Sequence, residues 1–338
     1  MTQCSCATSR RDFLASTISC GSWVALSLAA ADPFVRSAFA APLPTTHTVN
    51  AQPFARIDRL ADGVYAVIAT PEGGTQVVSN AGIIAGKDAT LVIEGQNTVA
   101  GGAWLSNAAK QLTGRYPTHL VLTHFHADHS GGLAGHLNAD ANPAIISTNA
   151  TRHLLIDKYI EDPKYDAGVK PETPLTTFRR VLVPDTVLVH PTDPVVIDLG
   201  RRSVTLTPRA GHTPSDLTIT IDDPAITWCG DLVFNGLFPY YGDAIPSVLT
   251  ETCKRLLDDP DMIYVPGHGS IADADGLRPY LDLLADVERA ARNAVAKGVP
   301  ASDAWRNYSL PASLVTWTRF RPDVFRFAFE AWERELRG

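Results

Sequence analysis

Residues 124–129 have the sequence His-Phe-His-Ala-Asp-His, and this segment constrains the fold more than any other part of the chain. The chain has only ten histidines among 338 residues, so three histidines and an aspartate within six positions are very improbable as a surface accident. Residues 119–122 just before it are apolar and typical of a strand, which places the segment in a loop at a strand end. In such a loop the side chains can surround a pair of metal ions, whereas a helix with this spacing could not present all four together.

Three later segments share a second pattern, an apolar strand followed by a glycine-bounded loop. They are residues 210–214, 228–231 and 265–269. Imidazole nitrogens and carboxylate oxygens are the ligands of catalytic zinc, and a glycine beside each candidate lets the backbone turn sharply or approach a metal closely. A collection of hydrogen-bonded core histidines is the alternative, and it explains the shared pattern less well. The predicted metal ligands are His124, His126, Asp128, His129, His212, Asp231 and His268.

In their order along the chain, these segments resemble the signature of the metallo-β-lactamase superfamily over about residues 60–275. The resemblance implies an α+β fold, a four-layer αββα sandwich with the metals at one edge of its sheets. It implies two zinc ions per chain, with iron or manganese as the alternative metals, and His129 favours two ions over one. It also implies a first zinc bound by His124, His126 and His212, a second bound by Asp128, His129 and His268, and Asp231 as the bridge between them.

The chemistry expected of such a site is hydrolysis. A zinc ion lowers the pKa of bound water from about 15.7 to near 7, so a hydroxide held between two ions can serve as the nucleophile. We assign Asp128 the catalytic role of orienting that hydroxide or passing a proton to the leaving group. The expected substrate is a small ester, lactone, amide or lactam. Two alternatives stay open: an iron-dependent oxidoreductase that resembles persulfide dioxygenases, and a thioesterase that resembles glyoxalase II.

The loop of residues 235–246 is the candidate for substrate contact, because it leaves the predicted Asp231 strand. It carries Phe238, Tyr240 and Tyr241, which either form an aromatic wall for an organic substrate or pack locally. Hydroxyl side chains beside the ligands could orient them or simply serve as turn and cap residues. These are Thr123, Ser130, Thr213 and Ser215.

Charge and composition exclude several partners. The formal net charge is −7, and the chain offers no basic run that could follow a phosphate backbone, so nucleic acid is not an expected partner. The interval between Asp231 and His268 is too short for the domain inserted in nucleic-acid-processing relatives. We expect no stable membrane span. Whether Cys229 and Cys253 form a disulfide is left open.

The first forty residues indicate export. Arg10 and Arg11 form a twin-arginine pattern, an apolar stretch follows at 18–31, and Ala38-Phe39-Ala40 supplies a cleavage site. We therefore expect residues 1–40 to be a removed signal peptide and the protein to be periplasmic. The expected domains are then a lead-in at 41–55, the metallo-β-lactamase domain at 56–275, and C-terminal helices at 276–338.

Apolar periodicity places the remaining elements. Helices are expected at 98–112, from 131 onward, at 245–257 and at 276–297, with two or more after 301. The last of these carries Phe325, Phe327, Phe329 and Trp332, which predict packing against the body, with a homodimer contact as the alternative. Strands are expected at 64–68, 77–84, 90–93, 144–146, 181–183, 195–197, 204–206, 217–221, 226–228 and 263–265.

Overall fold

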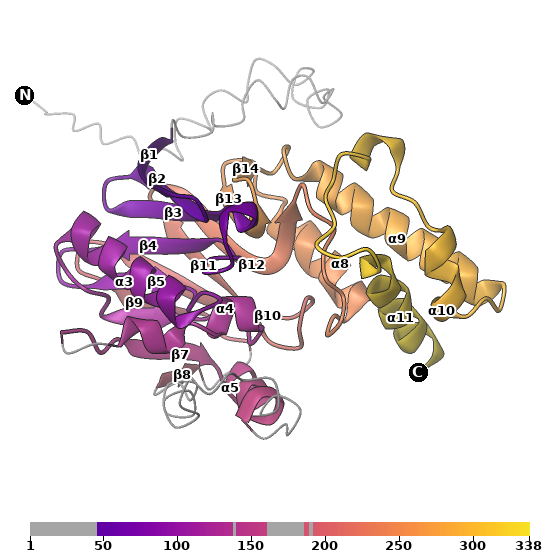
Figure 1. The fold of residues 1–338 in the computed structure, drawn as a ribbon, viewed down its shortest axis with the longest axis horizontal. Coiled ribbons are helices and arrows are strands. Elements are labelled where there is room, and N and C mark those ends of the chain that lie inside the picture. The colour runs from indigo at the N-terminus through magenta and orange to yellow at the C-terminus, as the bar shows by residue number, and fades with distance from the viewer. Residues whose placement is uncertain (1–45, 138–139, 161–185, 189–191) are drawn as a thin grey trace, which may run out of the picture. The chain divides into compact units, whose positions relative to one another are not determined.

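Two stacked β-sheets with helices on their outer faces form the molecule (Figure 1). This computed structural model describes residues 46–137, 140–160, 186–188 and 192–338. The predicted signal peptide and the predicted strand at 181–183 lie outside the described residues. The predicted α+β sandwich with C-terminal helices is confirmed.

The first sheet has eight strands, which lie side by side in chain order. Strands β1 to β5 are antiparallel to their neighbours, and β5 to β8 are parallel. Their bounds are β1 (His47–Gln52), β2 (Ala55–Ala61), β3 (Val64–Ala69), β4 (Ala81–Ala85), β5 (Thr90–Ile93), β6 (His119–Val121), β7 (Ala144–Thr148) and β8 (Thr186–Leu188).

Two parts of this sheet differ from the sequence expectation. Strand β1 lies within the predicted lead-in and is exposed along most of its length, so it lacks the apolar signal of a core strand. Strand β4 begins only at Ala81, although a strand was expected from residue 77. The residues just before it instead hydrogen-bond to distant parts of the chain: Ser79 donates to the Asp128 carbonyl at 2.8 Å, and Asn80 donates to the Pro266 carbonyl at 2.9 Å.

The second sheet has six strands in the order β14-β13-β12-β11-β10-β9. Strand β12 is central to it, antiparallel to β11 and parallel to β13. The bounds are β9 (Val195–Asp198), β10 (Ser203–Arg209), β11 (Asp216–Asp222), β12 (Ala225–Asn235), β13 (Ile263–Gly269) and β14 (Ala272–Asp273).

The helices begin and end where local chemistry directs. Thr98 accepts a hydrogen bond from the Gly101 amide at the start of α3 (Val99–Thr113), and Gly114 ends that helix with a φ of 78°. The helix expected from residue 131 is only a 3-10 turn, η2 (Leu133–His136). The other helices are α4 (Ala127–Ser130), α5 (Asn149–Leu155), α8 (Pro246–Leu256), α9 (Arg278–Ala296), α10 (Ala301–Ala304) and α11 (Val324–Arg337). The remaining elements are the 3-10 turns η1 (Pro71–Gly73), η4 (Trp305–Asn307) and η5 (Ala312–Leu314) and the π-helix η3 (Ile156–Ile160).

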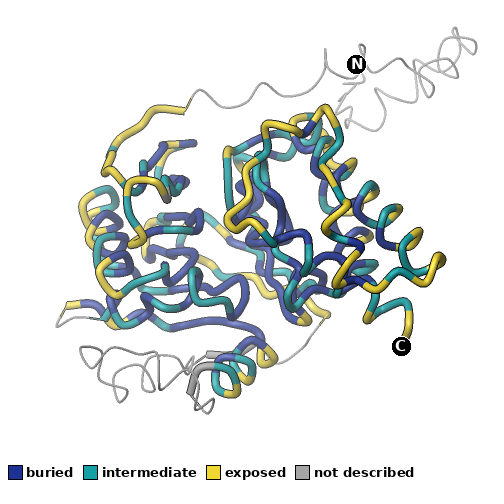
Figure 2. Tube along the Cα trace, turned by 45° about the vertical axis from the view of Figure 1, so that its right-hand side comes forward, coloured by how far each residue is buried: buried dark blue, intermediate teal, exposed yellow. Residues whose placement is uncertain are grey.

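Three clusters of buried apolar residues lie between the four layers, and Figure 2 shows the buried parts of the chain in dark blue. The middle cluster includes Leu91 of the first sheet and Ile219 of the second. The cluster under α3 includes Leu105. The cluster under the C-terminal helices includes Tyr280 of α9 and Trp332 of α11.

The C-terminal aromatic residues pack against the rest of the domain, which is the first of the two interpretations drawn from the sequence. Phe325, Phe329 and Trp332 are at most 5% exposed, and all three belong to the cluster that α8, α9 and α11 share. Cys229 and Cys253 are both buried free thiols. None of the helices in the described ranges combines the length and apolar character that a membrane span requires.

Candidate metal centre

The segment 124–129 follows strand β6, as the sequence predicted. His124 and His126 lie in the loop after the strand, whereas Asp128 and His129 lie in α4. The turn starts at His126, whose carbonyl oxygen accepts hydrogen bonds from the amides of His129 and Ser130 at 3.1 and 3.0 Å. The change from loop to helix within this segment directs its four side chains to different sides of one small volume.

The second sheet supplies the other three candidates. His212 lies in the loop between β10 and β11, Asp231 in β12 and His268 in β13. The parallel pairing of β12 with β13 sets Phe234 opposite His268. The two rings stack with centroids 5.2 Å apart and planes 13° apart, which fixes the orientation of the imidazole.

Two glycines make room for the Asp231 carboxylate. Gly230 adopts a φ of 53°, a left-handed conformation, where β12 passes Thr123. At Gly267 a Cβ would lie 2.0 Å from Asp231 Oδ1. Any side chain at residue 267 would therefore displace the carboxylate.

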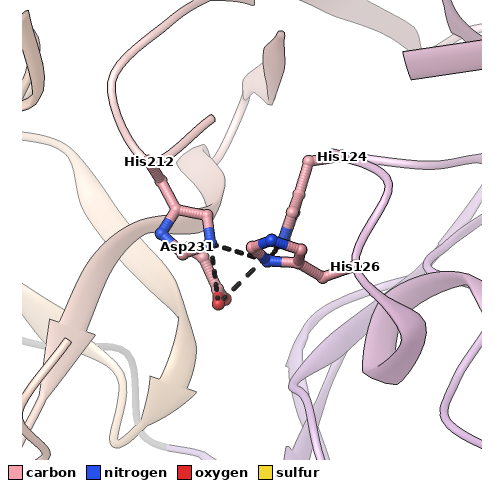
Figure 3. Close-up of side chains that lie close together, drawn as sticks. All are labelled: His124, His126, His212 and Asp231. Atoms are coloured by element: carbon pink, nitrogen blue, oxygen red, sulfur yellow. Dashed lines mark hydrogen bonds and ion pairs between the residues drawn. The ribbon is translucent and has the colours of Figure 1, made fainter. Parts of the chain in front are cut away.

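The first ligand group consists of His124, His126, His212 and Asp231, whose ligand atoms lie within 4.8 Å of one another. His126 Nδ1 is 3.0 Å from both His124 Nε2 and His212 Nε2. Asp231 Oδ2 is 3.4 Å from His212 Nε2 and 4.0 Å from His124 Nε2. The histidines of the loop after β6 and the two residues of the second sheet face each other across the group (Figure 3).

The second ligand group consists of Asp128, His129, His268 and Asp231, again with all ligand atoms within 4.8 Å. Asp231 Oδ1 lies 3.1 Å from His129 Nε2 and 3.3 Å from His268 Nε2. Asp128 Oδ2 lies 3.2 Å from His268 Nε2 and 3.5 Å from His129 Nε2. The two oxygens of Asp231 are thus divided between the groups, Oδ2 facing the first and Oδ1 the second.

Neighbouring acceptors determine which ring nitrogen of the first two histidines carries the proton. Thr123 Oγ1 donates to Glu94 Oε1 at 2.6 Å, so its contact of 2.9 Å with His124 Nδ1 requires a proton on that nitrogen. His126 Nε2 lies 2.9 Å from Asp243 Oδ2 and donates to it. In both histidines the other nitrogen, which faces the ligand group, therefore presents a lone pair.

His129 follows the same rule through Glu94. Its Nδ1 lies 3.0 Å from Glu94 Oε1, which leaves Nε2 to face Asp231. Glu94 itself has a φ of 76°, a strained conformation for a side chain other than glycine. Such strain persists only where surrounding contacts over-determine the residue, and it gathers at functional sites.

The ligand groups fit divalent metal ions. Two imidazole lone pairs that face each other at 3.0 Å cannot hydrogen-bond, and a cation between them removes the conflict. Zinc–nitrogen bonds of about 2.0–2.1 Å in a tetrahedron give edges of about 3.3 Å, close to the separations of the first group. Asp231 Oδ1 and His129 Nε2 are buried atoms without a hydrogen bond among the described residues, as expected of atoms that ligate an ion.

Burial and nearby charge shift the pKa values of the histidines differently in the two ligand groups. Burial lowers the pKa of His212 to about 3 and the pKa of His124 well below its usual value, so both rings are neutral near pH 7. Burial also acts to lower the pKa of His268, but Asp231 and Asp128 raise it to about 9. The first group is thus poor in positive charge, and the second pairs its histidines with carboxylates.

Solvent reaches the site from one side. The His126 and His268 side chains are each 12% exposed and that of Asp128 is 28% exposed, whereas the other four ligands are at most 4% exposed. The Tyr240 ring stands beside this opening, with its centroid 5.6 Å from that of His126. Asp128 is the ligand that a substrate can reach most easily.

The expected aromatic wall is reduced to one ring of the predicted three. Tyr240 lies beside the histidines, but Phe238 and Tyr241 are buried in the cluster under the C-terminal helices. Phe238 packs edge-on against Phe325 of α11, with centroids 4.7 Å apart. The contact partner comes from a distant part of the chain, so the sequence of the loop could not distinguish the rings.

Three residues near the site were not predicted: Glu94, Asp243 and Lys158. Glu94 follows a buried strand and precedes a glycine, which is the setting that identified Asp231, and this signal could have revealed it. Asp243 carried no comparable signal, and Lys158 contacts it from η3. Of the adjacent hydroxyl residues, Thr123 does contact a ligand, and Ser130 instead donates to backbone carbonyls.

The fold and these groups define an αββα protein with two adjacent candidate metal sites that share one carboxylate. Residues 74–268 match the metallo-beta-lactamase superfamily. The chain belongs to that superfamily.

Relatives of this chain include the acyl-coenzyme A thioesterase MBLAC2 of Homo sapiens, 29% identical over 181 residues, and that of Bos taurus, 28% identical over 182 residues. These matches cover 50% of this chain and 62% of each relative. Among solved structures, the sec-alkylsulfatase Pisa1 from Pseudomonas sp. has a TM-score of 0.63 at 15% identity, covering 83% of this chain and 50% of the sulfatase. The DIM-1 metallo-beta-lactamase has a TM-score of 0.52 at 18% identity, covering 69% and 97%. The structural similarities support the fold.

Proposed function

We propose that the protein is a two-metal hydrolase of small acyl compounds: esters, thioesters, lactones, amides or lactams. The division of the Asp231 oxygens between the two ligand groups carries the proposal, because two metal ions held by these groups would share that carboxylate. Zinc is the proposed metal, since imidazole and carboxylate ligands suit it. When bound, the pair of ions would supply a hydroxide nucleophile near neutral pH and polarise the substrate carbonyl.

The protein side chains supply orientation and proton transfer. Asp243 orients His126, and Glu94 orients His129 directly and His124 through Thr123, so that one nitrogen of each ring faces the ligand groups. Asp128 is the most exposed ligand, and its interactions with His129 and His268 keep its pKa at about 2 against the opposing effect of burial. It is therefore a carboxylate at neutral pH, and it can accept a proton from the nucleophile and pass it to the leaving group.

The relatives extend the substrate class that the sequence suggested. MBLAC2 is an acyl-coenzyme A thioesterase, so we place thioesters beside esters and lactams as candidate substrates. A thioester carbonyl is attacked by the same nucleophile and releases a thiolate, which needs less help from a proton donor than an amine does. Thioester hydrolysis should consequently depend on Asp128 less than amide hydrolysis does.

The test is a substrate panel on the full chain loaded with zinc, together with metal analysis. We expect about two zinc ions per chain and turnover of at least one acyl substrate. Asp128→Asn should lower kcat by about 100-fold or more, in line with the usual contribution of general acid–base catalysis. Glu251→Gln, on an exposed face of α8, is the matched control and should retain full activity.

Two outcomes would contradict the proposal. A protein with two zinc ions that hydrolyses no member of the panel is not an acyl hydrolase. One iron per chain with oxygen consumption would instead identify the oxidoreductase alternative. Full turnover by Asp128→Asn would refute the role of that residue while leaving the reaction class in place.

We also propose that the protein is exported through the twin-arginine pathway to the periplasm. The support is the sequence pattern around Arg10 and Arg11 and the small-residue cleavage site at 38–40. The experiment is fractionation of expressing cells, comparing the wild type with a variant in which both arginines are replaced by lysine. Processing and periplasmic recovery should be lost in the variant, and their retention would refute the proposal.

A further inference from the structure

We infer that residues 318–327 complete a substrate-binding surface beside the first ligand group, where they hold the apolar acyl or alkyl part of the substrate. The surface consists of Tyr240, Phe320 and Phe327, called here the aromatic surface. The inference rests on the proposed function and names the substrate class: compounds with a hydrophobic chain or ring next to the scissile bond.

Tyr240 connects this surface to the metal centre. Its ring centroid lies 5.6 Å from that of His126 and 6.5 Å from that of His212, two ligands of the first group. Both ring pairs meet edge to face. A substrate whose carbonyl sits over the ligand groups would therefore place its adjoining carbon atoms against Tyr240.

The other two rings extend the surface away from the metal ligands. Phe327 lies 5.0 Å and Phe320 5.8 Å from Tyr240, measured between centroids, and both meet it edge to face. Phe320 is 51% exposed. An exposed phenyl ring this close to a candidate active site is the kind of surface a hydrophobic ligand covers.

Backbone hydrogen bonds fix the surface in place. The Phe238 amide donates to the Thr318 carbonyl at 2.9 Å, and the Thr318 amide donates to the Gly236 carbonyl at 2.9 Å. These bonds join the C-terminal segment to the loop that leaves β12 just after Asp231. The contact of Phe238 with Phe325 reinforces the junction. The aromatic surface is thus held by the strand that carries the shared ligand.

The two arginines that lie over the Phe327 ring are each paired with carboxylates, which favours an apolar ligand over an anionic one at that ring. Arg321 and Arg326 stack over the Phe327 ring at 4.9 and 4.7 Å from its centroid. Both guanidinium groups also contact Asp323, and Arg326 contacts Glu330 at 3.4 Å. Arg321 and Arg326 are therefore matched by two carboxylates, whereas Arg319 of the same segment lies over the Phe325 ring, 5.3 Å from its centroid.

The experiment compares acetyl with octanoyl thioesters on the zinc-loaded full chain. The wild type should have the lower KM for the octanoyl compound. Phe320→Ala should raise that KM by about 10-fold, the lower end of what a lost hydrophobic contact costs, with kcat and the acetyl KM within twofold of the wild type. Val315→Ala is the matched control, because Val315 is 73% exposed in the same C-terminal segment.

Binding of the product acids makes the inference independent of turnover. Octanoate should bind the zinc-loaded protein more tightly than acetate in calorimetric titration, and Phe320→Ala should remove most of that difference. If hydrolysis fails while this difference is present and lost in the variant, the proposed function is refuted and the surface is supported. Equal affinity for octanoate and acetate, or an unchanged difference in Phe320→Ala, would overturn the inference.

Discussion

Glu94 Oε1 lies 3.0 Å from His129 Nδ1, and the same oxygen accepts a hydrogen bond of 2.6 Å from Thr123 Oγ1. Through Thr123 the carboxylate also reaches His124 Nδ1. One buried side chain thus orients a ligand of each group. Glu94 contacts the Nδ1 atom of His129 and, through Thr123, that of His124, whereas Asp231 faces the Nε2 atoms of both rings.

Replacing Glu94 should weaken both metal sites together. Glu94→Gln keeps the size of the side chain but removes the charge that orients His129 and Thr123, and the loss of such a partner commonly costs 10- to 100-fold in metal affinity. Competition with a chelator would measure both affinities. Thr123→Val should weaken only the first ligand group, so equal effects of both variants on both sites would contradict this arrangement.

Removing Asp231 should prevent the binding of both metal ions rather than of one. Asp231→Ala deletes the oxygen that faces each group, so zinc per chain should fall from about two to below one after gel filtration. Metal analysis checks this directly. Asp222→Ala, at the exposed end of β11 in the same sheet, should retain two ions. Retention of two ions in Asp231→Ala would show that the carboxylate is not shared.

Asp243 and Lys158 should differ in importance although they contact each other. Asp243 accepts from His126 Nε2, so Asp243→Ala should reduce the affinity of the first ligand group by about 10- to 100-fold. Lys158 is 40% exposed, and ion pairs at the surface contribute about 0–1 kcal/mol. Lys158→Ala should therefore change metal affinity by less than about 5-fold. Chelator competition on both variants tests the difference, and comparable losses would refute it.

His136 should make the folded protein sensitive to mild acid. Its side chain is fully buried, and burial lowers its pKa to about 4 from the usual 6.5. The unfolded chain therefore binds a proton first as pH falls, so stability is retained above about pH 6.5 and lost progressively down to about pH 4. The shift corresponds to about 3 kcal/mol at its full extent.

The measurement for His136 is denaturant unfolding of the zinc-loaded protein between pH 7.5 and 5. His136→Leu should show a shallower loss of unfolding free energy toward pH 5 than the wild type, whatever its stability at pH 7.5. Parallel curves for the two proteins would mean that His136 does not contribute to acid sensitivity.

The sequence predicted the sandwich fold and the seven candidate ligands, because the patterns that indicate them are local in the sequence. Each candidate lies in an apolar strand or in the segment that follows one, and the structure gathers all seven within two overlapping groups. The role of Asp243, and the fact that Tyr240 rather than Phe238 or Tyr241 lies beside the ligands, depend on contacts with distant segments of the chain. No pattern within residues 235–246 could show that α11 would cover Phe238.

The strands also differ in whether local sequence or contact with other segments determines them. Core strand β5 carries a continuous apolar run and β11 alternates apolar residues with threonines, and both were predicted closely. Strand β2 was not predicted, because the adjacent charged residues Asp58 and Arg59 interrupt the alternation of charged and apolar residues along Ala55–Ala61. Its pairing with β1 and β3 holds it in the sheet. Residues 79–80 resemble a strand but bond to helix α4 and strand β13, the elements that carry Asp128 and His268.

The division of the ligands between two sheets has a consequence for biosynthesis. The loop after β6 and helix α4 together carry four ligands, but His268 lies on β13, near the end of the sandwich. While the chain leaves the ribosome, the first ligand group is incomplete until Asp231 has been made, and the second is incomplete until His268 has been made. Metal capture should accordingly follow the folding of the second sheet, and an ion bound in the finished protein would resist any opening that separates the two sheets.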